Sequence, residues 1–251
     1  MVRLKVLWCA VAMVLATVTL ASAEDKVAVG VTADVFSKYL WRGQNIVDDW
    51  VLQPGASVGY QGLTGSVWGN LDLKGNLVDT GQLTEVDLAL DYSNKVPGWE
   101  TLGYSVGTIY YSFLNTHAHP TAEVYGGLSL DVPLAPAVRW YYDFDAIDGS
   151  YIQFSLGHTI EKIKTWTEDC HCDLQLGASL GYGTDGYNNG YFGVDQGGLN
   201  DLTLTAGLPF TFGKLTIKPS FGYSMMIDGD IRDKTAKSDN FWGGIGAAYN
   251  F

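Results

Sequence analysis

The chain has 251 residues, with 31 glycines, 15 tyrosines, 8 tryptophans and a formal net charge of −12 at pH 7. The negative charge argues against a nucleic-acid partner, because phosphate backbones bind basic surfaces. Beyond the first residues, no window approaches the about 18 consecutive apolar residues that mark a transmembrane helix. The aromatic residues and glycines, with apolar residues spread thinly between them, favour β-structure over a helical bundle.

The start of the chain has the pattern of a secretory signal peptide. A basic start precedes the apolar run Val6–Leu20, and Ala21-Ser22-Ala23 matches a signal-peptidase site. A retained membrane anchor is the alternative, but the run is short for a spanning helix. We therefore expect residues 1–23 to be a cleaved signal peptide and residues 24–251 to form one domain.

Twelve short segments of alternating apolar and polar residues follow. In the last of them Phe241, Ile245 and Tyr249 share one face, and Trp242 and Asn250 share the other. A strand of about 9–11 residues crosses a bilayer at a tilt, and a barrel wall turns alternate residues toward lipid and lumen. The sequence therefore predicts an all-β protein, a transmembrane antiparallel β-barrel of about 12 strands in contact with outer-membrane lipid. The segments lie near residues 27–40, 51–60, 63–72, 82–92, 101–113, 121–130, 137–144, 150–160, 173–182, 200–209, 213–225 and 240–251.

The connections between these segments alternate in length. An even number of strands places both ends of the barrel chain on one side, which is the periplasm in bacterial outer-membrane barrels. The long polar connections Gly183–Leu199 and Ile227–Asn240 then point outward, and the short ones Gln61-Gly62 and Asp131–Pro136 point to the periplasm. One periplasmic connection, Glu161–Cys172, is too long and too charged for a tight turn, which indicates a misplaced strand boundary.

A soluble β-sandwich with its apolar face inward is the alternative fold, because it shows a similar alternation. A sandwich needs neither a terminal aromatic strand nor the girdle aromatic residues of a membrane barrel. The barrel, with a location in the bacterial outer membrane, is therefore favoured. The girdle candidates are Trp41, Trp68, Tyr92, Tyr104 and Tyr223.

Charged residues of several strands converge on the expected lumen. Charges there avoid lipid and set selectivity in a water-filled pore. Six acids against four bases favour a channel for small polar solutes or ions that prefers cations. The alternative is that these groups pair across the lumen and fill it, because twelve strands lie between the filled barrels of about eight and the open ones of sixteen or more. The lumen candidates are Asp34, Lys38, Arg42, Glu85, Asp87, Asp91, Glu123, Arg139, Asp143 and Lys218.

Catalytic and metal-binding motifs are weak in this sequence. His117 and His119 flank Ala118 in an outward loop, a pattern more typical of exposed histidines than of metal ligands. Ser155 and His158 lie three residues apart on one strand, so they point to opposite faces and cannot act as a lipid-cleaving pair. No G-x-S-x-G nucleophile motif occurs. We expect no catalytic residue, metal or cofactor, and a lipid-modifying enzyme is the least favoured alternative.

Two cysteines remain after the signal peptide, Cys170 and Cys172. The periplasm permits oxidation, although a C-x-C bridge closes a small, strained ring. A disulfide between them is the first expectation, free thiols the second and a metal site the third.

Two motifs resemble the TorF family of porins. Ser37, Tyr39, Arg42 and Gly43 match a strand-end S-x-Y-x-x-R-G pattern, and the acidic pair in Thr84-Glu85-Val86-Asp87 precedes the aromatic Tyr92. The resemblance covers roughly residues 30–130 and implies an outer-membrane barrel assigned as a porin by analogy, without a defined solute. It also implies that the terminal Phe251 is similar to the signal read by the barrel-insertion machinery.

The matching residues suggest an interaction of their own. We expect Arg42 and the Glu85/Asp87 pair to point into the lumen and to form an ion-pair network that braces the wall. Gly43 should allow the tight turn into the first loop.

Overall fold

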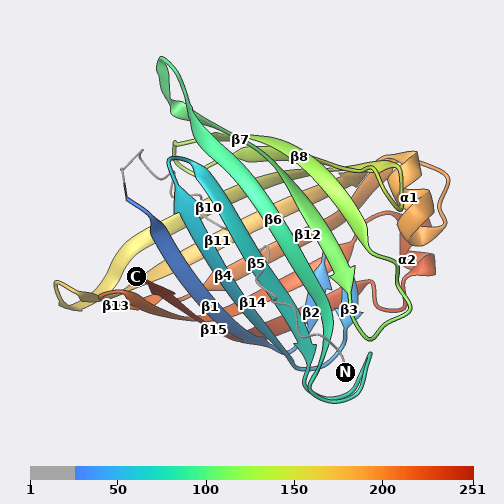
Figure 1. Cartoon of the computed structure of the whole chain (residues 1–251), viewed down its shortest axis with the longest axis horizontal. Helices are drawn as coiled ribbons and strands as arrows, with labels where there is room; N and C mark the ends of the chain where they lie inside the picture. The colour runs from blue at the N-terminus through green and yellow to red at the C-terminus, as the bar shows by residue number, and fades with distance from the viewer. Residues whose placement is uncertain (1–25) are drawn as a thin grey trace, which may run out of the picture.

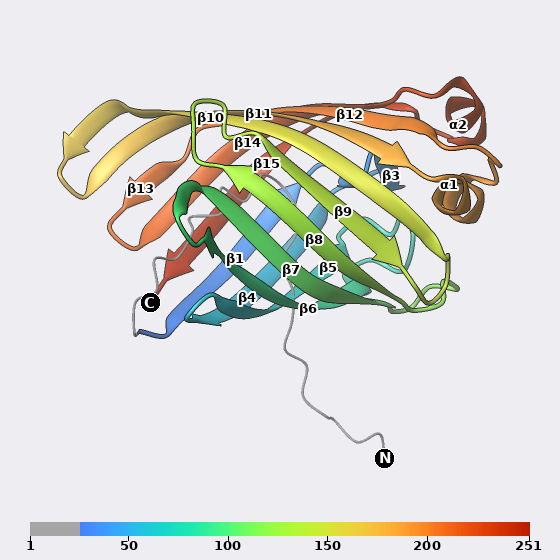
Figure 2. The same ribbon diagram turned by 90° about the horizontal axis from the view of Figure 1, so that it is seen from above.

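The computed structural model describes residues 26–251, so the expected signal peptide, residues 1–23, lies outside the described residues. The chain forms a closed antiparallel barrel of twelve strands, sealed where β1 pairs with β15 (Figures 1 and 2). The predicted fold class is confirmed. The wall consists of β1 (Ala28–Phe36), β4 (Val51–Tyr60), β5 (Leu63–Asp72), β6 (Gln82–Val96), β7 (Trp99–Phe113), β8 (Thr121–Leu130), β9 (Ala137–Asp143), β10 (Gly149–Thr167), β11 (Cys170–Gly183), β12 (Gly198–Gly207), β13 (Phe210–Phe212), β14 (Leu215–Met226) and β15 (Asp239–Asn250).

One strand of the wall is interrupted by a proline. β12 and β13 are separated by Leu208 and Pro209, and both pair with β14, so together they count as one of the twelve. Proline has no backbone N–H to donate to a sheet, which accounts for the break in the ladder.

The two ends of the barrel differ in their connections. One end, called here the turn end, has short turns such as Gln61-Gly62 and also carries the C-terminus (Figure 1). The other, called the loop end, carries the long connections, which confirms the predicted alternation of loop lengths. None of the described helices is long and apolar enough to cross a membrane. The loop end holds a hairpin of β2 (Tyr39–Trp41) and β3 (Gln44–Val47) and the helices α1 (Asp185–Phe192) and α2 (Gly229–Lys234).

Apolar side chains cover the outside of the wall. In β15, Phe241 is 78% exposed and Ile245 is 48% exposed, whereas the adjacent inward residue Asn240 is 1% exposed. Tyr92 and Tyr104 form a ring pair with centroids 6.2 Å apart, and exposed Tyr92 places this pair on the outer surface. The alternation seen in the sequence therefore separates an apolar exterior from a polar interior.

Two predicted girdle residues lie inside the barrel instead. Trp68 is 2% exposed, and its ring centroid lies 5.2 Å from that of Tyr39. Trp41 belongs to the β2–β3 hairpin, with its ring 5.1 Å from that of Tyr191. The prediction was wrong for Trp68 because it shares an inward face with polar Asn70, and for Trp41 because the wall strand ends before it.

The charged segment Glu161–Cys172 is strand rather than turn. β10 extends to Thr167 and β11 begins at Cys170, so only Glu168 and Asp169 form the connection. The resulting hairpin projects beyond the rim at the turn end (Figures 1 and 2). The expected boundaries were wrong here because the β10–β11 register shifts after Ile160, which breaks the period-two pattern.

Candidate functional site

The β2–β3 hairpin fills the loop-end half of the lumen. Its two-residue turn is Arg42-Gly43, with φ angles of 46° and 79°, and a type I′ hairpin turn needs both angles positive. Gly43 also supplies space, because a Cβ atom at that position would lie 2.4 Å from the Cβ atom of Asp201. Gly43 therefore allows a tight turn, as expected, but the turn joins β2 to β3 and does not lead from the wall strand into the first loop. The turn places Arg42 at the tip of the hairpin, inside the barrel.

Arg42 forms a buried, two-bonded ion pair with Glu123 of β8. Arg42 Nη1 donates to Glu123 Oε1 at 2.7 Å, and Arg42 Nη2 donates to Glu123 Oε2 at 2.6 Å. The side chains are 2% and 1% exposed. The Tyr111 hydroxyl also donates to Glu123 Oε2, at 2.9 Å. A planar guanidinium matches a carboxylate in this arrangement, and the added hydrogen bond helps to offset the cost of burying the charges.

Aromatic rings surround the Arg42 guanidinium on its remaining sides. Its central carbon lies 4.4 Å from the Trp41 and Tyr141 ring centroids, 4.6 Å from that of Tyr151 and 5.7 Å from that of Tyr187. These rings attract a cation through their negative faces. Burial raises the pKa of Tyr187, which lies in α1, so its hydroxyl stays neutral. The hairpin tip is therefore held by charge, hydrogen bonds and stacked rings together.

The predicted ion pair between Arg42 and Glu85 or Asp87 does not form. Both acids point into the lumen from β6, as expected, and are 4% and 9% exposed. Glu85 instead hydrogen-bonds Tyr39. The partner differs because the hairpin turn directs the guanidinium to β8 rather than to β6.

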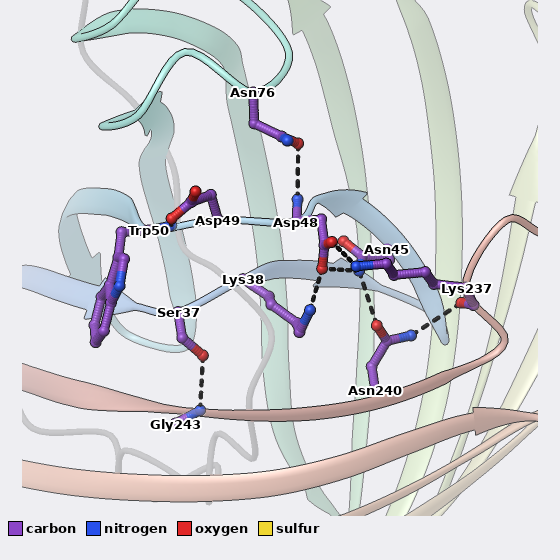
Figure 3. A network of polar contacts seen from close by, with 10 residues as sticks. All are labelled: Ser37, Lys38, Asn45, Asp48, Asp49, Trp50, Asn76, Lys237, Asn240 and Gly243. Carbon is purple, nitrogen blue, oxygen red and sulfur yellow. Dashed lines mark hydrogen bonds and ion pairs between the residues drawn. The ribbon is translucent and has the colours of Figure 1, made fainter.

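A second group of contacts holds the base of the hairpin at the loop end. The Asp48 carboxylate forms ion pairs with Lys38 and Lys237 and accepts a hydrogen bond from Asn45 Nδ2 at 2.8 Å. The Asp48 backbone N–H donates to Asn76 Oδ1 at 3.0 Å (Figure 3). Asp48 thereby connects the hairpin to the β5–β6 and β14–β15 connections.

The remaining lumen candidates of β1, β6, β9 and β14 lie apart from Arg42. Asp34 and Lys218 are both register partners of Gly246, so they face each other across β15. Asp91 accepts a hydrogen bond from the Tyr125 hydroxyl at 2.6 Å. The Arg139 guanidinium lies 5.2 Å from the centroid of the same Tyr125 ring.

Asp143 shapes a loop and does not face open water. It is fully buried and accepts from Thr121 Oγ1 at 2.8 Å and from the backbone N–H groups of Asp145 and Ala146 at 3.1 Å. These bonds organise the short β9–β10 connection at the loop end.

Between the hairpin and the turn end the lumen contains a cavity of about 800 Å³. The hairpin residues Leu40 and Arg42 line its inner part, and Lys95, Asp131 and Glu161 line it at the turn end. Small side chains on the wall leave this space open. They include Gly127, Ser129, Ala137, Ser155, Gly157, Ser179, Thr203 and Thr205.

Two residues of the site were not identified from the sequence. Asp201 is 1% exposed and accepts a hydrogen bond from the Tyr151 hydroxyl at 2.7 Å. Its alternation with Thr203 and Thr205 could have placed it in the lumen. Asp48 lies in a loop, where no periodic signal marks its position.

The other chemical candidates are dispersed. Cys170 and Cys172 are free thiols, so the expected bridge is not formed. In an extended strand their Cα atoms are roughly 6.6 Å apart, at the upper limit for a disulfide. His117 and His119 are exposed, and the part of the chain from residue 26 onward contains no group of three or more potential metal ligands. Ser155 lines the cavity, whereas His158 is exposed.

Comparison with known proteins identifies the fold alone. No protein-family model and no curated protein matches the chain. A KdgM porin gives a TM-score of 0.53 at 13% identity, over 89% of this chain and 99% of that chain. A KdgM porin in complex with disordered oligogalacturonate gives a TM-score of 0.53 at 12% identity, with the same coverage. A Salmonella typhi OmpF complex with daunomycin gives a TM-score of 0.39 at 9% identity, over 90% and 97% of the two chains. The chain shares the porin-like barrel fold of the two KdgM structures.

Proposed function

We propose that the chain is an outer-membrane channel for small polar solutes or ions. The observation that carries this proposal is the cavity of about 800 Å³ inside an apolar exterior, with small side chains such as Ser129, Ser155 and Thr203 on part of its wall. An apolar outer surface fits lipid, and a polar lumen fits water and dissolved solutes. In this arrangement the turn end faces the periplasm and the loop end faces outward.

The count of charged residues in the sequence is the ground for proposing a preference for cations. The ten lumen candidates contain six acids and four bases; Glu123 among them is paired with Arg42, and Asp143 is bonded within the β9–β10 connection. Rings of carboxylates favour cations in channels. The resemblance of the Arg42-Gly43 and Glu85–Asp87 motifs to the TorF porins supports the same class of function. By this proposal Phe251 is the residue read by the barrel-insertion machinery.

A closed barrel with a structural or binding role is the second candidate. The packing around Arg42 favours it, because Glu123, Tyr141 and Tyr151 are each at most 1% exposed. A lumen filled in this way would block flow unless the hairpin moves.

Single-channel recording separates the two candidates. The purified protein, shown to be folded by heat-modifiable gel mobility, is inserted into planar bilayers with a salt gradient. The channel proposal expects discrete current steps with a cation-to-anion permeability ratio above one. Folded protein that inserts and passes no current favours the closed barrel, and a ratio at or below one removes the cation preference alone.

A further inference from the structure

The β2–β3 hairpin lies inside the barrel, but no backbone pairing joins its strands to the wall, so it can move separately from the wall. β2 and β3 pair with each other in a separate two-stranded sheet and with no strand of the barrel. The wall ladder is complete without them, since β1 pairs directly with β4 and with β15. The hairpin can therefore leave the lumen without breaking a backbone hydrogen bond of the barrel.

The inward position of the hairpin leaves several polar atoms without partners. On the hairpin these are Arg42 Nε, Gln44 Nε2 and Asn45 Oδ1, and on the wall beside it they are Trp68 Nε1 and Asp87 Oδ1. Buried polar atoms without hydrogen bonds are costly, and hydration would remove that cost. The ion pair of Arg42 and the burial of Tyr39 and Val47 oppose this effect. Opposed terms of this kind bring two arrangements of one segment close in free energy.

We propose that this hairpin is a gate, held closed by two latches and opening the channel when it swings outward. The inner latch is Arg42 with Glu123, and the outer latch is Asp48 with Lys38 and Lys237. The inference rests on the proposed channel function, which it deepens by assigning the element that controls flow.

The two latches differ in exposure and therefore in their response to salt. The inner pair is 2% and 1% exposed, whereas the Lys237 side chain is 53% exposed and that of Asp48 is 26% exposed. Dissolved ions screen exposed charges much more than buried ones. Raising the salt concentration therefore increases the fraction of time that the channel is open. Asp48→Asn should raise the open probability roughly two- to fivefold at low salt and remove its salt dependence.

A reversible cross-link tests the gate directly. Asn45 on the hairpin donates to Asn240 of β15 at 2.8 Å between the amide atoms, so cysteines at these positions lie within reach of a short bis-thiosulfonate reagent. The variant Asn45→Cys/Asn240→Cys is made in a background with Cys170→Ser and Cys172→Ser. If the hairpin is a gate, cross-linking should lower the open probability by about tenfold or more, which corresponds to a change of about 1.4 kcal/mol in the free energy of opening. Reducing agent should restore it.

The controls separate a failed gate from a failed channel. Asn45→Cys alone, treated with the same reagent, should conduct as before treatment, and Arg42→Ala should conduct more than the native protein. A cross-linked protein with the same open probability as the reduced one overturns the gate and leaves the channel in place. Absence of current in the native, reduced and Arg42→Ala proteins overturns the channel and the gate together.

Discussion

The two halves of the lumen are enclosed by the same twelve strands and differ in the side chains that face inward. In the loop-end half, large residues such as Tyr141, Tyr151 and Glu123 are almost completely buried. In the turn-end half, small residues such as Ser155 and Ser179 surround a cavity of about 800 Å³. The volume of the inward side chains, together with the folded-in hairpin, therefore decides where a barrel of this strand number is filled.

The halves also treat charge differently. In the filled half Arg42 has a dedicated carboxylate partner, because a buried charge must be paired. In the open half Arg139 lies beside Tyr125 and donates to Ser105 Oγ at 3.5 Å, and among residues 26–251 no carboxylate oxygen lies within 4.0 Å of its guanidinium nitrogens. Water in the cavity can solvate that guanidinium. Removal of a charge should therefore lower the free energy of unfolding more in the filled half than in the open half.

The largest effect is expected for the buried charge. Arg42→Ala leaves Glu123 buried without its partner and should lower the free energy of unfolding by about 3–5 kcal/mol. Arg139→Ala, the matched change in the open half, should cost about 1 kcal/mol. Urea titration in detergent micelles, followed by heat-modifiable gel mobility, measures both. Equal losses in the two variants would show that the halves do not differ in solvation.

An added indole should distinguish the filled half from the open half. Thr121 is 3% exposed and bonds to the fully buried Asp143 at the loop end, so Thr121→Trp has no space and should cost about 3 kcal/mol. Ser155→Trp points into the cavity and should leave the unfolding midpoint nearly unchanged while reducing single-channel conductance. Unchanged conductance in Ser155→Trp would place the ion path elsewhere.

A methyl group at the hairpin turn should have a smaller effect. Gly43→Ala combines a positive φ angle with a Cβ contact of 2.4 Å and should destabilise by about 2 kcal/mol. Gly98 also has a positive φ angle, but a Cβ atom added there meets no atom within 4 Å. Gly98→Ala therefore measures the cost of the backbone conformation alone, about 1 kcal/mol. If both variants unfold at the same urea concentration, the close approach to Asp201 does not constrain the hairpin.

The smallest effect is expected outside the lumen. Arg232 of α2 donates to Asp239 Oδ2 at 2.5 Å, and the two side chains are 38% and 42% exposed. Exposed ion pairs contribute at most about 1 kcal/mol, so Arg232→Ala should shift the unfolding free energy by less than that amount. A loss comparable to that of Arg42→Ala would contradict the importance assigned to burial.

The wall of the barrel could be predicted from the sequence because alternation reports directly on which residues face lipid. Phe241 and Ile245 show this in β15, where exposure follows the predicted face. The pattern fails where the register shifts, as it does after Ile160 in β10. β10 has two extra residues between its pairings at Ile160 and Lys164 and one more between Thr165 and Thr167, and no local signal marks these changes.

The interior could be predicted only in part. The inward direction of Glu123 and Arg42 was expected, but their pairing was not, because it depends on a hairpin that turns back into the lumen. Its turn signal, Arg42-Gly43, is present in the sequence. A turn residue does not indicate whether the following chain extends outward or folds inward, and that choice depends on the space left by the surrounding strands.

The seam between β1 and β15 brings together residues from opposite ends of the chain, such as Gly30 and Asn250. Bringing these strands together closes a loop that contains the whole barrel chain, and this costs conformational entropy before any β1–β15 hydrogen bond forms. Proteins dominated by such distant contacts fold slowly. The cylinder therefore cannot seal until β15 has been synthesised. Until that moment its two open edges can pair with other chains, so aggregation before closure is the hazard that this topology carries.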